Sequence, residues 1–525
     1  PRTSMMRSLN PLRWTSSTWV LLALLSLYLV QLAGAPLFDV DEGAFAEASR
    51  EMLASGDWGH TTLNGNDRFD KPIFIYWCQA ALMAVFGPHD WVARLPSALA
   101  ILAALITVWR FASTHWGEET GQRAGFILAS SLGLLAIGRA ATADGMLNSL
   151  LIATCLALWQ FASTGSRSAL RWAYVWCGLG LLTKGPVAVL VPGVTLVAWS
   201  LLSDQGRTAW RAFWEPKGWL LLLVIAAPWY LYALNRHGMA FVEGFFLKHN
   251  VQRFTGTLEG HGGNGLYYLA VLPLLVLPWS PWCLRVLGGL RQQWADPLKR
   301  FLWIWLLFVL SFFSLSGTKL PHYMLYGITP LVLLMAAQSN QSSKSRLWTG
   351  LMWVFASLAC VLAYGLPHLV AWGANQTTDT WYRDLLASAP DGQYLQYAAV
   401  GVSLLGAALL LVLGRWRVWP RLMLYIWSVS MLWTCAAIPW LGAVLQDPFR
   451  HVANWAHTNH PQARIVQWQM HQPSYAFYWG QPTPQHPPAP DEWVIARQDR
   501  LQGLALTKYE TAYNHRGLLL LKPVP

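Results

Sequence analysis

The sequence is poor in charge. Only 12% of its 525 residues are Lys, Arg, Asp or Glu, whereas soluble domains carry about 25%. This scarcity excludes an ordinary soluble protein, and 54% of the residues are hydrophobic. Apolar runs long enough to cross about 30 Å of hydrocarbon recur along most of the chain. The composition therefore predicts a polytopic membrane protein.

Cysteine patterns that form disulfides or bind metals are also missing. The six Cys all fall in apolar segments and none forms a CxxC pair, so we interpret them as small packing residues. The net charge of +12 does not indicate nucleic-acid binding, because the basic residues stand in short loops between apolar runs, as membrane topology signals do. No internal repeat is visible, which argues against transporter folds built from duplicated halves.

The apolar runs predict about thirteen membrane spans. We expect them near residues 18–35, 90–112, 122–138, 141–163, 170–184, 186–202, 217–235, 264–284, 300–317, 321–338, 346–371, 394–414 and 420–441. The first run ends in Ala33-Gly-Ala35, which resembles a signal-peptide cleavage site, but we interpret it as the first span. A cytoplasmic N-terminus then places the loops richest in Lys and Arg in the cytoplasm, as the positive-inside rule requires.

Two regions outside these spans have their own character. Within a transmembrane domain of residues 1–441, residues 36–89 form the first extracytoplasmic loop. Its apolar piece 72–87 is short and bounded by prolines, so we expect a helix lying in the membrane interface. Residues 442–525 are Pro-rich with short strand-like runs, which predict a small extracytoplasmic α/β domain.

The stretch LFDVDEGAFAEASREML (37–53) concentrates five carboxylates in this charge-poor chain. The pattern predicts an amphipathic helix that begins at Asp41 and ends near Gly56. Asp39 or Asp41 acting merely as a helix cap is the simpler interpretation. The cluster is denser than a cap requires, so Asp41 and Glu42 are catalytic candidates.

Further charged residues emerge on the same predicted face. Lys184 lies between two apolar helices, where an ammonium group needs an anionic partner. Lys71 could instead snorkel to the interface, and Asp144 could cap a helix. The remaining candidates on this face are His249, Arg253, Lys319, His322 and Tyr323. Few anions flanked by several cations at a membrane surface indicate a ligand with a phosphate head and a lipid tail, with a carboxylate as base or orienting group.

Six segments carry a family resemblance. They are DEGAFAEASREMLASGDW, RFDKP, ATADGMLNSLL, LLTKGPVAVLVP, FFLKHNVQRFTG and SLSGTKLPHYMLYGITP. In this order they resemble bacterial membrane glycosyltransferases of the GT-C type, in the protein O-mannosyltransferase-like superfamily, and most of all the lipid A aminoarabinose transferases. The resemblance implies an all-α GT-C membrane fold in the bacterial inner membrane, with interfacial helices in the first periplasmic loop.

The resemblance also implies a reaction. A sugar on undecaprenyl phosphate would pass to a periplasmic acceptor, with lipid A phosphate preferred and a protein or polysaccharide hydroxyl as the alternative. A transporter or flippase of a lipid-linked sugar is the alternative from another class. The expected partners are this donor, the acceptor and membrane lipids, with no nucleic acid and a monomeric protein.

Roles for single residues follow from the same resemblance. Asp41 and Asp144 would lie at the reaction centre, and Lys71, Arg253 and Tyr323 would bind the donor phosphate. Lys184 and Lys319 are candidates for the acceptor or a second phosphate. No cofactor is required; a divalent metal would find ligands in Asp70, His249 and His322. The sequence departs from the aminoarabinose enzymes at Ala44-Phe45, where they carry Arg-Tyr, and at Asp70-Lys71-Pro72-Ile73, where they carry Glu-Lys-Pro-Pro. The sugar and the acceptor are therefore left open.

Overall fold

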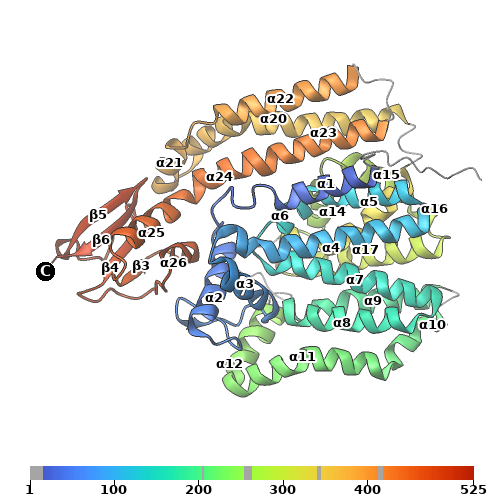
Figure 1. Cartoon of the computed structure of the whole chain (residues 1–525), viewed down its shortest axis with the longest axis horizontal. Coiled ribbons are helices and arrows are strands. Elements are labelled where there is room, and N and C mark those ends of the chain that lie inside the picture. The colour runs from blue at the N-terminus through green and yellow to red at the C-terminus, as the bar shows by residue number, and fades with distance from the viewer. Residues whose placement is uncertain (1–15, 204–205, 253–262, 340–344, 412–417, 525) are drawn as a thin grey trace, which may run out of the picture.

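The computed structural model of the chain is a bundle of long helices with a small sheet at one end (Figure 1). It describes residues 16–203, 206–252, 263–339, 345–411 and 418–524. The helices of the first half of the bundle are α1 (Ser16–Leu29), α4 (Asp90–Trp116), α5 (Glu118–Ala129), α6 (Leu132–Gly138), α7 (Ala143–Thr164), α8 (Arg167–Lys184), α9 (Val187–Leu202), α10 (Arg207–Trp210), η1 (Arg211–Trp214) and α11 (Pro216–His237).

The second half of the bundle follows two short elements, α12 (Met239–Phe241) and the π-helix η2 (Val242–Gln252). Its helices are α14 (Tyr267–Leu275), α15 (Ser280–Leu287), α16 (Leu290–Gln293), α17 (Pro297–Leu315), η3 (Pro321–Gly327), α18 (Ile328–Ala337), α20 (Arg346–Gln376), α21 (Thr380–Ala387), α22 (Gln393–Leu411), α23 (Val418–Leu432), η4 (Trp433–Ala437) and α24 (Ile438–Leu445). Figure 1 shows α20, α22 and α23 running side by side along one flank.

Length and apolarity identify the helices that can cross a membrane. In the described residues seven are long enough: α4, α7, α11, α17, α20, α22, and the continuous run Val418–Leu445 formed by α23, η4 and α24. Four more apolar helices of 10–17 residues are Ser16–Leu29, Phe74–Phe86, Val187–Leu202 and Pro321–Ala337. The chain is therefore a multi-pass membrane protein.

Two of the expected spans are not single helices. The run 122–138 is split between α5 and α6, and the break falls at Ser130-Ser131. Both serine hydroxyls donate to the carbonyl four residues earlier, a bond that bends helices. The run 264–284 is split between α14 and α15 around Pro278, because a residue before proline disfavours the helical conformation. Apolar length alone does not reveal such breaks.

The first loop after α1 contains two helices and a hairpin. Helix α2 (Asp41–Ser55) begins at Asp41 and ends at Gly56, whose φ of 71° gives a left-handed cap, as the sequence predicts. The strands β1 (Thr62–Leu63) and β2 (Asn66–Asp67) pair antiparallel. The segment Arg68–Ile73 then leads into helix α3 (Phe74–Phe86). This helix corresponds to the interfacial helix that the sequence predicts at 72–87.

The C-terminal part forms the expected α/β unit. Its helices and strands are α25 (Asp447–Asn459), β3 (Ile465–Trp468), α26 (Pro473–Trp479), β4 (Trp493–Arg497), η5 (Leu506–Lys508), β5 (Tyr509–His515) and β6 (Leu518–Pro523). The sheet order is β3-β4-β6-β5, parallel only between β3 and β4. Alternate residues Leu518 and Leu520 pack with Phe449 of α25 and with Trp381 of α21. The core of this unit thus includes a residue that precedes the proposed boundary at 442.

The C-terminal unit is docked on α2. Asp39 accepts hydrogen bonds from the backbone N–H (2.9 Å) and the hydroxyl of Ser474. Arg50 donates to the carbonyl of Gly480 over 2.7 Å. A side chain on Gly43 would place its Cβ 2.5 Å from the Ser474 nitrogen, so glycine permits this close approach. These contacts hold the acidic loop between the bundle and the sheet.

Candidate functional site

Three side chains from three separate helices meet at the end of the bundle. The Lys184 ammonium donates to the Asp144 carboxylate and, over 3.0 Å, to the Tyr326 hydroxyl. The Tyr326 hydroxyl in turn donates to Asp144 over 2.9 Å. The Lys184 and Asp144 side chains are only 10% and 11% exposed. The anionic partner that the sequence requires for Lys184 is therefore Asp144.

Local sequence explains why these groups meet. Asp144 stands in the first turn of α7, where the positive end of the helix dipole favours a carboxylate. Lys184 is the last residue of α8, and the following Gly185 has φ of 84° and leads into Pro186. Glycine and then proline end the helix there. The Lys184 ammonium therefore lies at the C-terminal end of α8, the negative end of the helix dipole. Thr142 and Asp144 make no side-chain cap of α7, so the capping interpretation does not hold.

Four more of the predicted residues surround this triad. The His322 Nε2 atom lies 3.8 Å from the Asp144 carboxylate. The Lys184 ammonium lies 5.3 Å from the centre of the Tyr323 ring. Asp41 is exposed at the start of α2, and the charges of both Asp41 and Lys71 act on His322. The structure thus brings Asp144, Lys184, His322 and Tyr323 into contact, and the charges of Asp41 and Lys71 reach this group.

Glu42 lies elsewhere, which corrects its nomination as a catalytic residue. Its carboxylate faces the protein and pairs with Arg94 over 2.7 and 2.9 Å. It also accepts the backbone N–H groups of Phe38 (2.9 Å) and Ala141 (2.7 Å). Burial alone would raise the pKa of Glu42, but Arg94 and these donors hold that pKa below its ordinary value. Because Arg94 and two backbone donors surround the Glu42 carboxylate on the protein side, these contacts argue for a structural role.

Lys319 is likewise occupied. Its ammonium is buried and donates to the carbonyls of Ser314 and Ser316, each over 2.8 Å, at the C-terminal end of α17. These contacts satisfy carbonyls that a helix end leaves open, and they argue for a structural role. Arg253 lies outside the described residues, as does the side chain of His249.

Two of the three predicted metal ligands, Asp70 and His322, lie in the described part of the chain. Asp70 pairs with Arg68 over 3.1 Å. His322 lies beside Asp144, between a carboxylate and the Lys184 ammonium. Since the two residues have different neighbours, no step of the chemistry proposed below depends on a metal bound by them.

Sequence reasoning missed Tyr326 and Arg68. Tyr326 follows His322 at the spacing of one helical turn within SLSGTKLPHYMLYGITP, a signal that could have identified it. Arg68 in the RFDKP turn donates to the Tyr76 hydroxyl over 3.2 Å and lies 5.6 Å over the Phe45 ring. The charges of Asp41 and Asp70 both act on Arg68 and favour its charged form. It is a further cation beside the acidic loop.

Comparisons with known proteins agree with this architecture. The profile of the family described as dolichyl-phosphate-mannose-protein mannosyltransferase matches residues 70–232. The crystal structure of ArnT from Cupriavidus metallidurans bound to undecaprenyl phosphate superposes with a TM-score of 0.83 at 23% identity, covering 97% of this chain and 99% of that one. The chain thus has the fold of the GT-C class of membrane glycosyltransferases.

Sequence relatives define the family more narrowly. The undecaprenyl phosphate-alpha-4-amino-4-deoxy-L-arabinose arabinosyl transferase of Aeromonas hydrophila is 32% identical over 377 residues, 68% of each chain. The enzyme of the same name from Pseudomonas aeruginosa is 35% identical over 334 residues, and the match spans 61% of this chain but only 59% of that relative's length. The chain belongs to the family of undecaprenyl phosphate-aminoarabinose arabinosyl transferases.

Proposed function

We propose that this protein transfers 4-amino-4-deoxy-L-arabinose from undecaprenyl phosphate to an acceptor at the outer face of the bacterial inner membrane. The observation that carries the proposal is the cluster of Asp144, Lys184 and Tyr326, with His322 and Tyr323 beside it, at one end of a membrane bundle. Its family membership supplies the donor class. The proposal places the N-terminus in the cytoplasm and both the cluster and residues 442–525 in the periplasm.

Donor recognition is assigned to the cations and the phenol nearest the cluster. Lys71, Arg253 and Tyr323 would hold the phosphate, because charge-assisted hydrogen bonds to phosphate are strong in a partly dry site. Lys71 lies in the segment between the β1–β2 hairpin and α3, which the proposed orientation would place where a lipid phosphate meets water. The apolar bundle alongside would take the polyprenyl tail.

The chemical step breaks the bond between the anomeric carbon and the donor phosphate oxygen. A nucleophilic acceptor oxygen forms the new bond to that carbon, and undecaprenyl phosphate leaves as a phosphate monoester. Asp144 accepts hydrogen bonds from Lys184 and Tyr326, which hold its carboxylate in place. It would stabilise positive charge developing at the sugar, as preorganised dipoles and charges do in transition states. Asp41, exposed and close to His322, would orient or deprotonate the acceptor.

The acceptor proposed is a phosphate of lipid A. A phosphate oxygen is ionised at neutral pH and needs orientation more than deprotonation, whereas a hydroxyl needs a base. The cations beside the acidic loop, Arg68 and Lys71, would face this second anionic group.

The test uses the full-length protein in lipid nanodiscs with undecaprenyl phosphate–aminoarabinose and lipid A. Mass spectrometry is expected to show the mass of the added sugar on lipid A with the wild type and loss of most product with Asp144→Asn. The matched control is Asp491→Asn, an exposed carboxylate of the C-terminal unit. Sugar found on a hydroxyl acceptor, with lipid A unmodified, would contradict the acceptor and leave the transferase assignment standing; no transfer to any acceptor would contradict both.

A further inference from the structure

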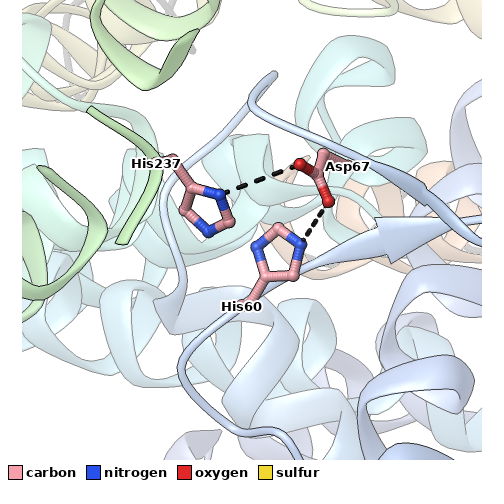
Figure 2. Close-up of side chains that lie close together, drawn as sticks. All are labelled: His60, Asp67 and His237. Atoms are coloured by element: carbon pink, nitrogen blue, oxygen red, sulfur yellow. Dashed lines mark hydrogen bonds and ion pairs between the residues drawn. The ribbon is translucent and has the colours of Figure 1, made fainter. Parts of the chain in front are cut away.

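A second group of titratable side chains lies apart from the proposed reaction centre. His60 in the loop after α2, Asp67 on β2 and His237 at the end of α11 lie close together, with one oxygen of the Asp67 carboxylate directed at each ring (Figure 2). One ligand atom from each lies within 4.8 Å of the others. The Nε2 atom of His60 is 2.9 Å from one Asp67 oxygen, and the Nδ1 atom of His237 is 3.8 Å from the other.

We propose that His60, Asp67 and His237 bind a divalent transition-metal ion of the zinc type. Two imidazoles and one carboxylate are a donor set that zinc uses, at about 2.0–2.2 Å in a tetrahedral arrangement. Ligands at that distance from one centre stand roughly 3.4 Å apart. The separations of 2.9 and 3.8 Å lie on either side of this value, and all three ligand atoms lie within 4.8 Å of one another, so rotations of the side chains would complete the site.

Burial supports a bound ion rather than a loose surface cluster. The side chains of His60 and His237 are only 8% and 12% exposed. The Asp67 side chain is 58% exposed. It therefore leaves an entry path and an open fourth position for water.

A metal here would act as a clamp. The hairpin β1–β2 has two residues in each strand, and an isolated two-stranded hairpin is marginally stable in water. An ion held by Asp67 on the hairpin and by His237 on α11 would tie the hairpin to the bundle. Phe69, two residues beyond Asp67, packs edge-on against the His237 ring with centroids 5.1 Å apart. The clamp would thereby fix the turn that carries Lys71.

Metal content tests the site without any substrate. The full-length protein, purified through a tag other than polyhistidine and stripped with chelator, is dialysed against zinc and measured by mass spectrometry of the metal. We expect about one zinc per chain in the wild type, which is lost in His60→Ala and His237→Ala and weakened in Asp67→Asn. Cobalt in place of zinc should give the visible absorption of a tetrahedral site. That spectrum is read on the wild type, so it does not depend on whether the variants fold.

The C-terminal unit offers a matched control. His451 and His515 stack with ring centroids 4.2 Å apart, and His515 lies 3.7 Å from Asp447. Among the described residues, however, these three do not bring one ligand atom each within 4.8 Å of one another. The double variant His451→Ala/His515→Ala should keep the zinc. Wild-type zinc no higher than in His60→Ala/His237→Ala, or no tetrahedral cobalt spectrum, would overturn the site. The effect of the clamp on Lys71 rests on the proposed function, whereas zinc binding does not. A protein that binds zinc but transfers no sugar would contradict the proposed function and leave the zinc site standing.

Discussion

Two acid–base pairs at the same end of the bundle differ in how they are completed. Glu42 and Arg94 have side chains 7% and 6% exposed, and further backbone donors and acceptors surround both. Asp144 and Lys184 are nearly as buried, but they face His322, Tyr323 and Tyr326, with the charges of Asp41 and Lys71 nearby. The first pair is closed by the protein itself, whereas the second leaves a face for a ligand.

The largest expected effect comes from breaking the closed pair. In Arg94→Met the Glu42 carboxylate would remain buried without its cation, and losing one partner of a buried pair costs about 3–5 kcal/mol. The purified variant should unfold at a clearly lower temperature in detergent. Arg94→Met/Glu42→Gln should recover part of the loss, because no buried charge then remains. Equal stability of the wild type and Arg94→Met would show that this pair does not hold the loop.

A substitution beside the Asp144–Lys184 pair, which faces the proposed ligand, should change activity rather than stability. Asp41→Asn is expected to lower turnover on the order of 10²-fold, the contribution of an acid, base or orienting carboxylate. Its melting temperature should equal that of the wild type, because Asp41 is exposed. Asp491→Asn serves as the control in the same transfer assay. Full activity in Asp41→Asn would show that the Asp41 carboxylate takes no part in the reaction.

Two lysines sharpen the comparison further. Lys71→Ala should weaken binding of undecaprenyl phosphate by about 2 kcal/mol, the loss of one charged hydrogen bond. Lys319→Met should leave that affinity unchanged and lower the stability, because the carbonyls of Ser314 and Ser316 lose their donor. Titration of both variants in nanodiscs separates the two roles. Equal loss of affinity in both variants would place Lys319 in the binding site.

The sequence predicts local features of this architecture better than the contacts that complete it. The start of α2 at Asp41, its end at Gly56 and the need of Lys184 for an anion follow from helix signals and from the cost of burying charge. The burial of Glu42 does not, since it depends on Arg94 of α4 and on α26 covering α2. The fold joins Asp39 to Ser474, and His60 to His237, although the members of each pair are far apart in the sequence. No sequence spacing predicts these contacts.

The smallest effect concerns a third carboxylate, three residues before Glu42. Asp39 accepts hydrogen bonds from Ser474 rather than from an arginine. Burial raises the pKa of Asp39 to about 7; the Ser474 hydrogen bonds oppose this rise and the nearby Glu42 charge adds to it. A carboxyl group whose folded-state pKa is raised binds its proton more tightly in the folded protein.

Its contribution to stability is therefore complete below the ordinary carboxyl pKa and is lost as the pH rises through about 7. Glu42, whose pKa is lowered, behaves in the opposite way, and its contribution is lost only when the solution is made acidic. Docking of the C-terminal unit on α2 should thus tighten slightly between pH 8 and pH 6, measured as slower hydrogen exchange of the α26 amides. Asp39→Asn cannot titrate and should remove this dependence, while Asp384→Asn, on the exposed side of α21, should keep it. The same pH profile in wild type and Asp39→Asn would assign the titration to another group.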